Sequence, residues 1–390
     1  MAAIKVAAKA GASAADKAGA IIAAALLLPG VIAPIAHAET APESSLIAFK
    51  YLQYQDSQPG LTRIKVTSPS LYLMVPVSPQ WAVEGSLVGD SVSGATPRYH
   101  SAISGATLKM KDNRAAGDVK VTRYFDRATT SASLSRSREH DYESTALGLD
   151  ASFSTEDNNR TWNIGLGFTN DKITSSNDIG LNEKKRTTEF MVGVTQALTA
   201  NDLLQINLTR NQGRGYYTDP YKFPDERPRT RNQNIALVRL NHHFTDLGAT
   251  LRTSYRYYSD SFGIKAHTLG AEWVQPVNAT LTITPSLRSY SQRAASFYFD
   301  PVYDAIAGEP FPPGFFNNPT QIISADQRLA SFGGITLGVK FALQATPEWL
   351  LDLKLERYEQ RSNWVFTGNG SPGIAPFRAN FIQLGASKKF

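Results

Sequence analysis

The sequence predicts an all-β fold, a transmembrane antiparallel β-barrel of roughly 14 to 16 strands with long outer loops. Three observations predict it. The chain begins with an export signal, continues in segments of about ten residues in which apolar and polar side chains alternate, and ends in a strand that closes on Phe390. No window beyond residue 38 offers an apolar stretch long enough for a transmembrane helix. We therefore expect the protein in the outer membrane of a Gram-negative bacterium.

The export signal occupies residues 1–38. Three lysines precede an apolar run over residues 18–28, and the small-residue site Ala36-His37-Ala38 follows it. The run falls short of the ~20 residues that a membrane anchor helix needs. We expect residues 1–38 to be a cleaved signal peptide and residues 39–390 to form the outer-membrane barrel.

Alternation with a period of two is the main evidence for strands, because a strand sends successive side chains to opposite faces. Residues 46–56, 62–77 and 81–89 are the first three expected strands. A soluble β-sandwich alternates as well. The export signal and polar faces rich in Gly, Ser, Thr and Asn favour the membrane barrel. One face of the clearest segment is apolar and consists of Trp162, Ile164, Leu166 and Phe168.

The last segment has the pattern of a closing strand. Ile382, Leu384, Ala386 and Phe390 share one face, while Gln383, Gly385, Ser387 and Lys389 share the other. Lys388 interrupts the apolar face near the expected periplasmic end, where a lysine can extend its ammonium group to water. Such strands are read by the barrel assembly machinery, which we expect as a partner together with the lipid of the outer membrane.

Aromatic residues near segment ends fit the interfacial girdles of such barrels. They are Trp81, Trp162, Trp273, Trp349 and Tyr358. Long irregular connections are expected at residues 91–118, 211–232 and 294–328. A barrel with short turns at one rim and long loops at the other places the last two outside the cell.

Composition excludes several classes of function. The chain has no cysteine, which rules out disulfides, thiolate metal sites and Cys-x-x-Cys-His haem attachment. Loss of the leader lowers the net charge from +6 to about +4, which is too diffuse to indicate nucleic acid. His242 and His243 are adjacent and therefore face opposite sides of a strand, so a shared metal site is not expected. No nucleophile, base and oxyanion arrangement is visible, and no catalytic residue is assigned.

One segment stands apart from barrel architecture, Asp90-Ser91-Val92-Ser93-Gly94-Ala95-Thr96, followed by a second Ser104-Gly105-Ala106-Thr107. It resembles the sequence on which a periplasmic flavin transferase attaches FMN in the flavin-carrying subunits of sodium-pumping and Rnf-type oxidoreductases. By that resemblance Thr96 is the acceptor of a phosphoester, and Asp90, Ser93, Gly94 and Ala95 belong to the recognition segment. Thr107 is a weaker acceptor, because Ser101 stands where the first copy has Asp90. The alternative is ordinary turn composition in a chain rich in these residues.

The mature chain as a whole resembles the domain-of-unknown-function 3570 family of predicted bacterial outer-membrane proteins. The resemblance implies three partners: an FAD:protein FMN transferase, a small lipoprotein and a thioredoxin-like protein. Besides Asp90 to Thr96, the matching features are Glu139-His140-Asp141-Tyr142, Gly215-Tyr216-Tyr217-Thr218-Asp219-Pro220-Tyr221-Lys222 with Arg227-Pro228, and Ala325-Asp326-Gln327-Arg328-Leu329.

Arg252 and Arg256 share one face of a strand and are expected to line the lumen. We expect them to pair with lumen acids such as Glu272 or Glu356. The alternative is an anion-attracting pore wall.

The leading functional hypothesis is a redox carrier rather than a stand-alone enzyme, a barrel that holds covalent FMN on Thr96 and passes electrons at the cell envelope. The alternatives are a passive porin-like channel or small-solute transporter and, less favoured, a structural or adhesive barrel. The strand count brings the segment after Asp90 to the outer rim, although the transferase is periplasmic. FMN is then added before insertion, or residues 91–118 fold back into the lumen as a plug, or the count is off by one.

Overall fold

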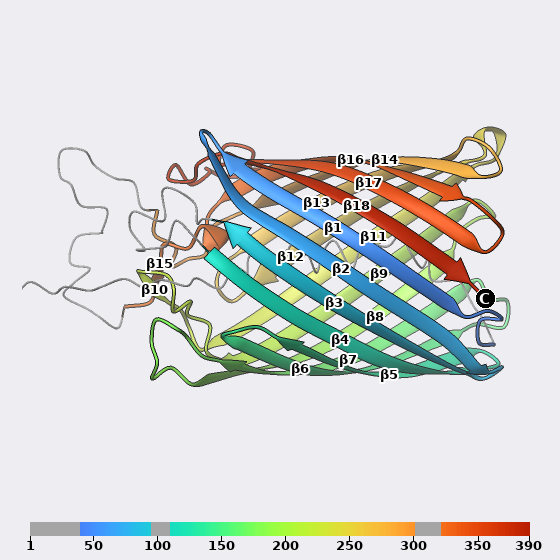
Figure 1. The fold of residues 1–390 in the computed structure, drawn as a ribbon, viewed down its shortest axis with the longest axis horizontal. Coiled ribbons are helices and arrows are strands. Elements are labelled where there is room, and N and C mark those ends of the chain that lie inside the picture. Colours follow the sequence, from blue (N-terminus) through green and yellow to red (C-terminus); the bar gives the residue numbers. More distant parts are fainter. Residues whose placement is uncertain (1–39, 95–109, 301–320) are drawn as a thin grey trace, which may run out of the picture.

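The protein is a closed antiparallel barrel with sixteen strands in the described part of the chain. The computed structural model describes residues 40–94, 110–300 and 321–390. The expected signal peptide, residues 1–38, lies outside them. Each strand pairs with its neighbours in sequence, and β1 pairs with β18 to close the wall (Figure 1). This count agrees with the upper end of the expectation from periodicity.

The first half of the wall consists of β1 (Leu46–Gln58), β2 (Leu61–Ser78), β3 (Trp81–Gly94), β4 (Met110–Phe125), β5 (Ala128–Arg138), β6 (Tyr142–Ser154), β7 (Arg160–Ile173), β8 (Glu183–Ala197) and β9 (Asp202–Gly215). The second half consists of β11 (Thr230–Phe244), β12 (Ala249–Asp260), β13 (Lys265–Pro276), β14 (Leu281–Gln292), β16 (Phe332–Gln344), β17 (Trp349–Arg361) and β18 (Phe377–Lys389). Three short elements lie in loops or turns, the 3-10 helices η1 (Thr245–Leu247) and η3 (Gln327–Leu329), and a two-stranded sheet of β10 (Asp225–Glu226) and β15 (Ile323–Ser324).

The two ends of the barrel differ in their connections. Both β1 and β18 meet at one end, where Leu46 pairs with Lys389, and the other connections there are short. We call this the turn end. At the opposite end, the loop end, long connections follow β9, β14 and β17, and they hold β10 and β15 (Figure 1, left). Outer-membrane barrels keep short turns in the periplasm and long loops outside the cell, so the loop end is the outer one.

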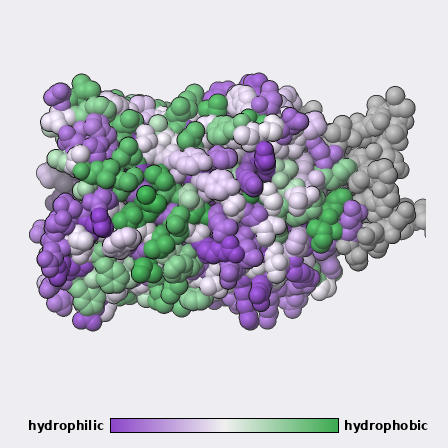
Figure 2. Space-filling view, turned by 180° about the vertical axis from the view of Figure 1, so that it is seen from behind, coloured by the Kyte–Doolittle hydropathy of each residue, from purple (hydrophilic) through white to green (hydrophobic). Residues whose placement is uncertain are grey.

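The outer face of the wall is apolar and faces lipid. Leu87, Leu134, Leu208 and Leu384 are each more than half exposed, which only a nonpolar surrounding makes favourable. Figure 2 shows hydrophobic side chains gathered over the barrel wall, with hydrophilic residues at the turn end. Every strand of a closed barrel satisfies its backbone hydrogen bonds through its neighbours, as the hydrocarbon layer requires. The chain is therefore an outer-membrane β-barrel. Among the described residues, no helix is long and apolar enough to cross a membrane.

The expected aromatic girdle is confirmed in four of its five members. Trp81, Trp162 and Trp349 begin their strands at the turn end with 40 to 46% of their surface exposed, and Trp273 lies near the turn end of β13. Lys388 lies over the ring of Trp349, 5.7 Å from its centroid. Tyr358 was wrongly expected in the girdle. It shares the inward face of β17 with Asp352, packs on Phe377 and donates a hydrogen bond to Gln360.

The prediction of an irregular segment at 91–118 is wrong at both ends. Strand β3 continues to Gly94 and β4 already begins at Met110, with Ser91 paired to Asn113 and Gly89 to Ala115. The outward positions here are small or polar, so the apolar alternation that marks a lipid-facing strand disappears while the pairing continues. A plug role can now concern only residues 95–109, which lie outside the described residues.

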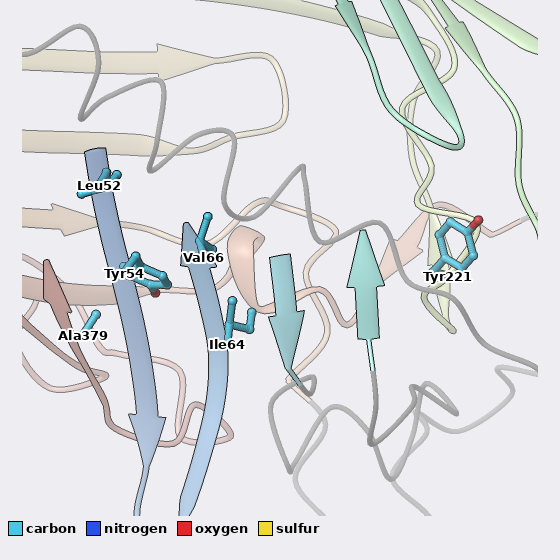
Figure 3. Close-up of a cluster of buried hydrophobic side chains, with 6 residues drawn as sticks. All are labelled: Leu52, Tyr54, Ile64, Val66, Tyr221 and Ala379. Carbon is cyan, nitrogen blue, oxygen red and sulfur yellow. The ribbon is translucent and has the colours of Figure 1, made fainter. Parts of the chain in front are cut away.

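The inner face carries an apolar cluster between β1, β2 and β18. Leu52 and Tyr54 of β1 and Ile64 and Val66 of β2 are at most 3% exposed, and Tyr54 packs on Phe381 with ring centroids 4.8 Å apart (Figure 3). Ala379 and Tyr221 belong to the same cluster. The inner wall is therefore not uniformly polar near the closing seam.

Candidate functional site at the loop end

The residues of the predicted flavin motif lie where β3 reaches the loop end. Asp90 is 5% exposed and faces inward, and its Oδ2 accepts a hydrogen bond of 2.6 Å from Nε of Arg114 on β4. Its Oδ1 is sealed from solvent without a hydrogen-bond partner. Ser93 and Gly94 end the strand, paired with Lys111 and Met110. Ala95, Thr96 and Thr107 lie outside the described residues.

This arrangement limits when a transferase could read the motif. In the folded barrel the Asp90 carboxylate is buried on the inner face near the loop end and held by Arg114, so an enzyme cannot reach it from the periplasm. A segment at the end of a strand fits FMN attachment only if recognition precedes the pairing of β3 with β4. The structure agrees with the expected strand count, because β3 ends at the loop end. It therefore excludes the explanation that the count is off by one and leaves the other two open.

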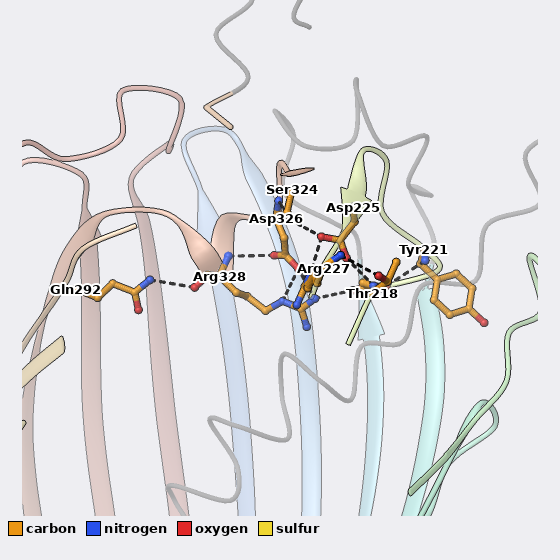
Figure 4. A network of polar contacts seen from close by, with 9 residues as sticks. Thr218, Tyr221, Asp225, Arg227, Gln292, Ser324, Asp326 and Arg328 are labelled. Atoms are coloured by element: carbon orange, nitrogen blue, oxygen red, sulfur yellow. Dashed lines mark hydrogen bonds and ion pairs between the residues drawn. The ribbon is translucent and has the colours of Figure 1, made fainter. Parts of the chain in front are cut away.

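A second site, which sequence reasoning did not assign, joins the loop after β9 to the loop after β14. Arg227 Nε donates to Asp225 at 2.9 Å, and its Nη2 donates to Asp326 at 2.7 Å (Figure 4). Arg328 Nη2 donates to Asp219 at 2.6 Å and its Nε to Asp326 at 2.7 Å. The pairing of β10 with β15 aligns the two loops. We call these five residues the loop network.

Four of the five residues of the loop network are buried although they are charged, and Arg328 is partly buried. Asp326 is fully buried, and Asp219, Asp225 and Arg227 are 8 to 9% exposed. Burial by itself would raise the pKa of Asp326, but Arg328 and Arg227 hold that pKa well below its ordinary value. Burial would raise the pKa of Asp219 too, but the combined charges of Arg328, Lys222 and Arg227 lower it. Both carboxylates are therefore ionised and act as acceptors for the two guanidinium groups.

Lys222 adds a third cation. It is 8% exposed, and its Nζ has no hydrogen-bond partner. Its charge lowers the pKa of both Asp219 and Asp326, so it stabilises these two carboxylates electrostatically without a direct bond.

Tyr221 extends the loop network toward two further loops. Its hydroxyl donates to Asp141, between β5 and β6, and accepts a hydrogen bond of 2.8 Å from the backbone N–H of Ser176, between β7 and β8. Burial raises the pKa of Tyr221, and the bond to Asp141 adds to the effect. Four loops are thereby tied together.

Apolar packing supports the same end of the barrel. Phe262, Ile264, Ala295 and Leu329 form a buried cluster against which Tyr217 and Phe297 pack. Leu329 belongs to η3, whose N-cap Asp326 accepts a hydrogen bond from the backbone N–H of Arg328. Asp326 thus fixes a helix turn and two arginines at once.

Four of the five residues of the loop network, all but Asp225, come from segments that the sequence had singled out only through the family resemblance, 215–222 with Arg227 and 325–329. Tyr221 joins them to Asp141 of a third such segment, 139–142. Their convergence explains why these separated segments form one pattern. Spacing could not reveal it, because the bonded residues lie as many as 109 positions apart. In the described ranges, no group of three or more metal-ligating side chains could hold a metal ion.

The family model described as "Protein of unknown function (DUF3570)" matches residues 101–183 and 175–381. The chain belongs to this family. The match covers the wall from β4 to the first part of β18 and the loop network. No curated protein matches the sequence significantly.

Solved structures share the barrel architecture. CdiB from Acinetobacter baumannii matches with a TM-score of 0.49 and 10% identity over 87% of this chain and 60% of that one. A bacterial polysaccharide outer membrane secretin matches with a TM-score of 0.49 and 7% identity over 88% and 98%. OccK9 (OpdG) from Pseudomonas aeruginosa matches with a TM-score of 0.44 and 10% identity over 89% and 98%. The chain spans about 60% of the length of CdiB, and similarity at this level does not specify a function.

Proposed function

We propose that this outer-membrane barrel carries FMN as a phosphoester on Thr96 and takes part in electron transfer at the cell envelope. The observation that supports the proposal is the segment Asp90 to Thr96, with its second Ser-Gly-Ala-Thr copy ending at Thr107. Strand β3 ends two positions before Thr96, so the proposal assigns the cofactor to the loop end of the barrel.

The chain's own contribution would be attachment and placement. The Thr96 hydroxyl would replace AMP on the FMN phosphate of FAD, which leaves a phosphoester and free AMP. A bound flavin accepts one or two electrons, while the protein determines where it lies. Because Asp90 is bonded to Arg114 in the folded wall, attachment would take place on the unfolded chain in the periplasm.

Mass analysis of the mature protein tests the proposal. The full precursor is coexpressed with an FAD:protein FMN transferase and purified from outer membranes. We expect an intact mass increased by FMN less one water, retained in Thr107→Ala and lost in Thr96→Ala. A wild-type chain without the adduct, despite an active transferase, overturns the proposal.

The order of attachment and folding has its own test. The mature chain is presented to transferase and FAD either unfolded in urea diluted to a tolerated concentration or already folded in detergent. We expect labelling only of the unfolded chain. Equal labelling of the folded barrel contradicts the role given to the Asp90–Arg114 bond.

A second candidate function is the passage of small solutes, and one observation favours it. Barrels with 16 to 18 strands leave an aqueous channel, as a general property of their diameter. This wall has sixteen strands in its described part. Conductance in planar bilayers distinguishes the two readings, because a barrel closed at the loop end should be nearly silent and an open one should not.

A further inference from the structure

Four arginines lie on the inner face of neighbouring strands, Arg239 on β11, Arg252 and Arg256 on β12, and Arg288 on β14. Their inward direction follows from their neighbours: Val238 and Leu240 beside Arg239 are exposed to lipid, as are Tyr255 and Leu287 beside the others. We call these four residues the lumen arginines.

The strand register places the lumen arginines around two small residues, Ser254 and Gly270. Arg239 is paired with Ser254, Ser254 with Gly270, and Gly270 with Arg288, so these four form one row across four strands. Arg252 and Arg256 flank Ser254 on the same face of β12, two positions to either side. A Cβ on Gly270 would lie 2.7 Å from Ser254 Oγ, so there is no room for a larger side chain beside Ser254 at the centre of the row.

The lumen arginines are not neutralised by acids. Glu272 stands in register with Arg252, but among the described residues no ion pair joins any of the four guanidinium groups to a carboxylate. The expected ion pairs with Glu272 or Glu356 are not found in the described part of the chain, and Glu356 instead bonds Lys354 at 2.9 Å. Arg239 donates to Gln205 at 3.3 Å, and Arg256 lies 5.5 Å from the ring centroid of Tyr258.

The opposite wall behaves differently, which shows that unpaired arginines are not the rule in this lumen. Asp90 is bonded to Arg114, and Glu84 is paired with Lys120 at 3.5 Å and accepts a hydrogen bond from Tyr72. Strands β3 and β4 lie across the barrel from β12 and β13 in the strand order. Arg114 and Lys120 on this side are therefore paired with acids, whereas the lumen arginines are not.

Unpaired arginines at membrane depth repel one another, and a bound anion relieves that repulsion. The planar guanidinium group binds carboxylate and phosphate oxygens with two parallel hydrogen bonds. We propose that the lumen arginines form a binding site for solutes that carry phosphate or carboxylate groups. The site lies on strands remote from Thr96 and is independent of FMN. If the barrel passes small solutes, the site names their chemical class. In that respect the proposal rests on the second candidate function, solute passage.

The test is the binding of inorganic pyrophosphate to the folded mature chain in detergent, measured by calorimetry. We expect binding that weakens as chloride is raised, and that falls at least about tenfold when Arg252, Arg256 and Arg288 are all changed to Gln, since one charged hydrogen bond contributes about a factor of ten. The matched control changes Arg136, Arg138 and Arg210 to Gln, because these are exposed and carry the same total charge.

Two results overturn the proposal: a wild-type barrel that does not bind pyrophosphate, and a control variant that loses as much affinity as the lumen variant. Heat-modifiable migration on gels confirms that each variant has folded. If the barrel conducts, its reversal potential in a KCl gradient should show anion preference that the lumen variant loses. A cation preference in the wild type counts against the site. Failure of FMN attachment changes none of these outcomes.

Discussion

The turn end and the loop end of this barrel are stabilised over different distances along the chain. At the turn between β6 and β7, the exposed Asp157 accepts hydrogen bonds from Thr155 and Asn159, two positions away on either side. At the loop end, Arg227 and Asp326 bond across 99 positions, and Tyr221 and Asp141 across 80. The side-chain bonds of this turn therefore stay within the turn, whereas those of the loop end join distant loops.

The largest effect is expected from Arg227→Met. It leaves Asp225 and Asp326 buried with one partner fewer each, and breaking a buried ion pair costs about 3–5 kcal/mol. Hydrogen exchange followed by mass spectrometry should show loss of protection in 219–227 and 323–329. Arg127→Met is the matched control, because its partner Glu156 is exposed at the turn end. Equal loss in the control would show that the two ends do not differ.

A fall in pH should loosen the loop network. The pKa of Asp326 and that of Asp219 are held below the ordinary value of 3.8 by the neighbouring cations, against the effect of burial. Their contribution to stability is therefore complete above that value and is lost as the pH falls below it through the folded pKa. Burial raises the pKa of Asp225, so protonation of that carboxyl in the folded state does not destabilise the loop network. Exchange corrected for its intrinsic pH dependence should therefore not rise until the pH falls below about 4. A rise that begins near neutral pH would contradict the assignment.

Tyr221→Phe should have an intermediate effect. It removes the hydroxyl that binds Asp141 and the backbone N–H of Ser176, and hydrogen bonds of this kind contribute about 1–2 kcal/mol together. We expect protection to fall in 174–177 while 323–329 changes less. Tyr51→Phe, on the lipid face of β1, serves as the control. If 174–177 keeps full protection, Tyr221 does not tie these loops.

The smallest effect is expected from Asp157→Asn. Hydrogen bonds from the Thr155 hydroxyl and from Asn159 lower the pKa of Asp157 to about 2, but the side chain is fully exposed. Exchange should change within 154–160 and nowhere at the loop end. A change at 323–329 would mean that the two ends are coupled through the wall.

Much of the wall could be predicted from alternation. The first three strands were expected at 46–56, 62–77 and 81–89 and are observed at 46–58, 61–78 and 81–94. The closing strand was recognised from Ile382, Leu384 and Phe390, which are 44 to 63% exposed. The prediction failed where the outward side chains are Gly89, Ser91 and Ala115, because such residues carry no apolar signal. Tyr358 was misplaced although its parity with Asp352 already indicated the inward face.

The sequence by itself determined the outer-membrane location and the fold class of this protein, because two-residue alternation acts over short stretches of chain. Only the tertiary structure decided the loop network and the row from Arg239 to Arg288. Both depend on strand register and on loops meeting across the barrel, and the contacts involved join residues that no short-range pattern relates.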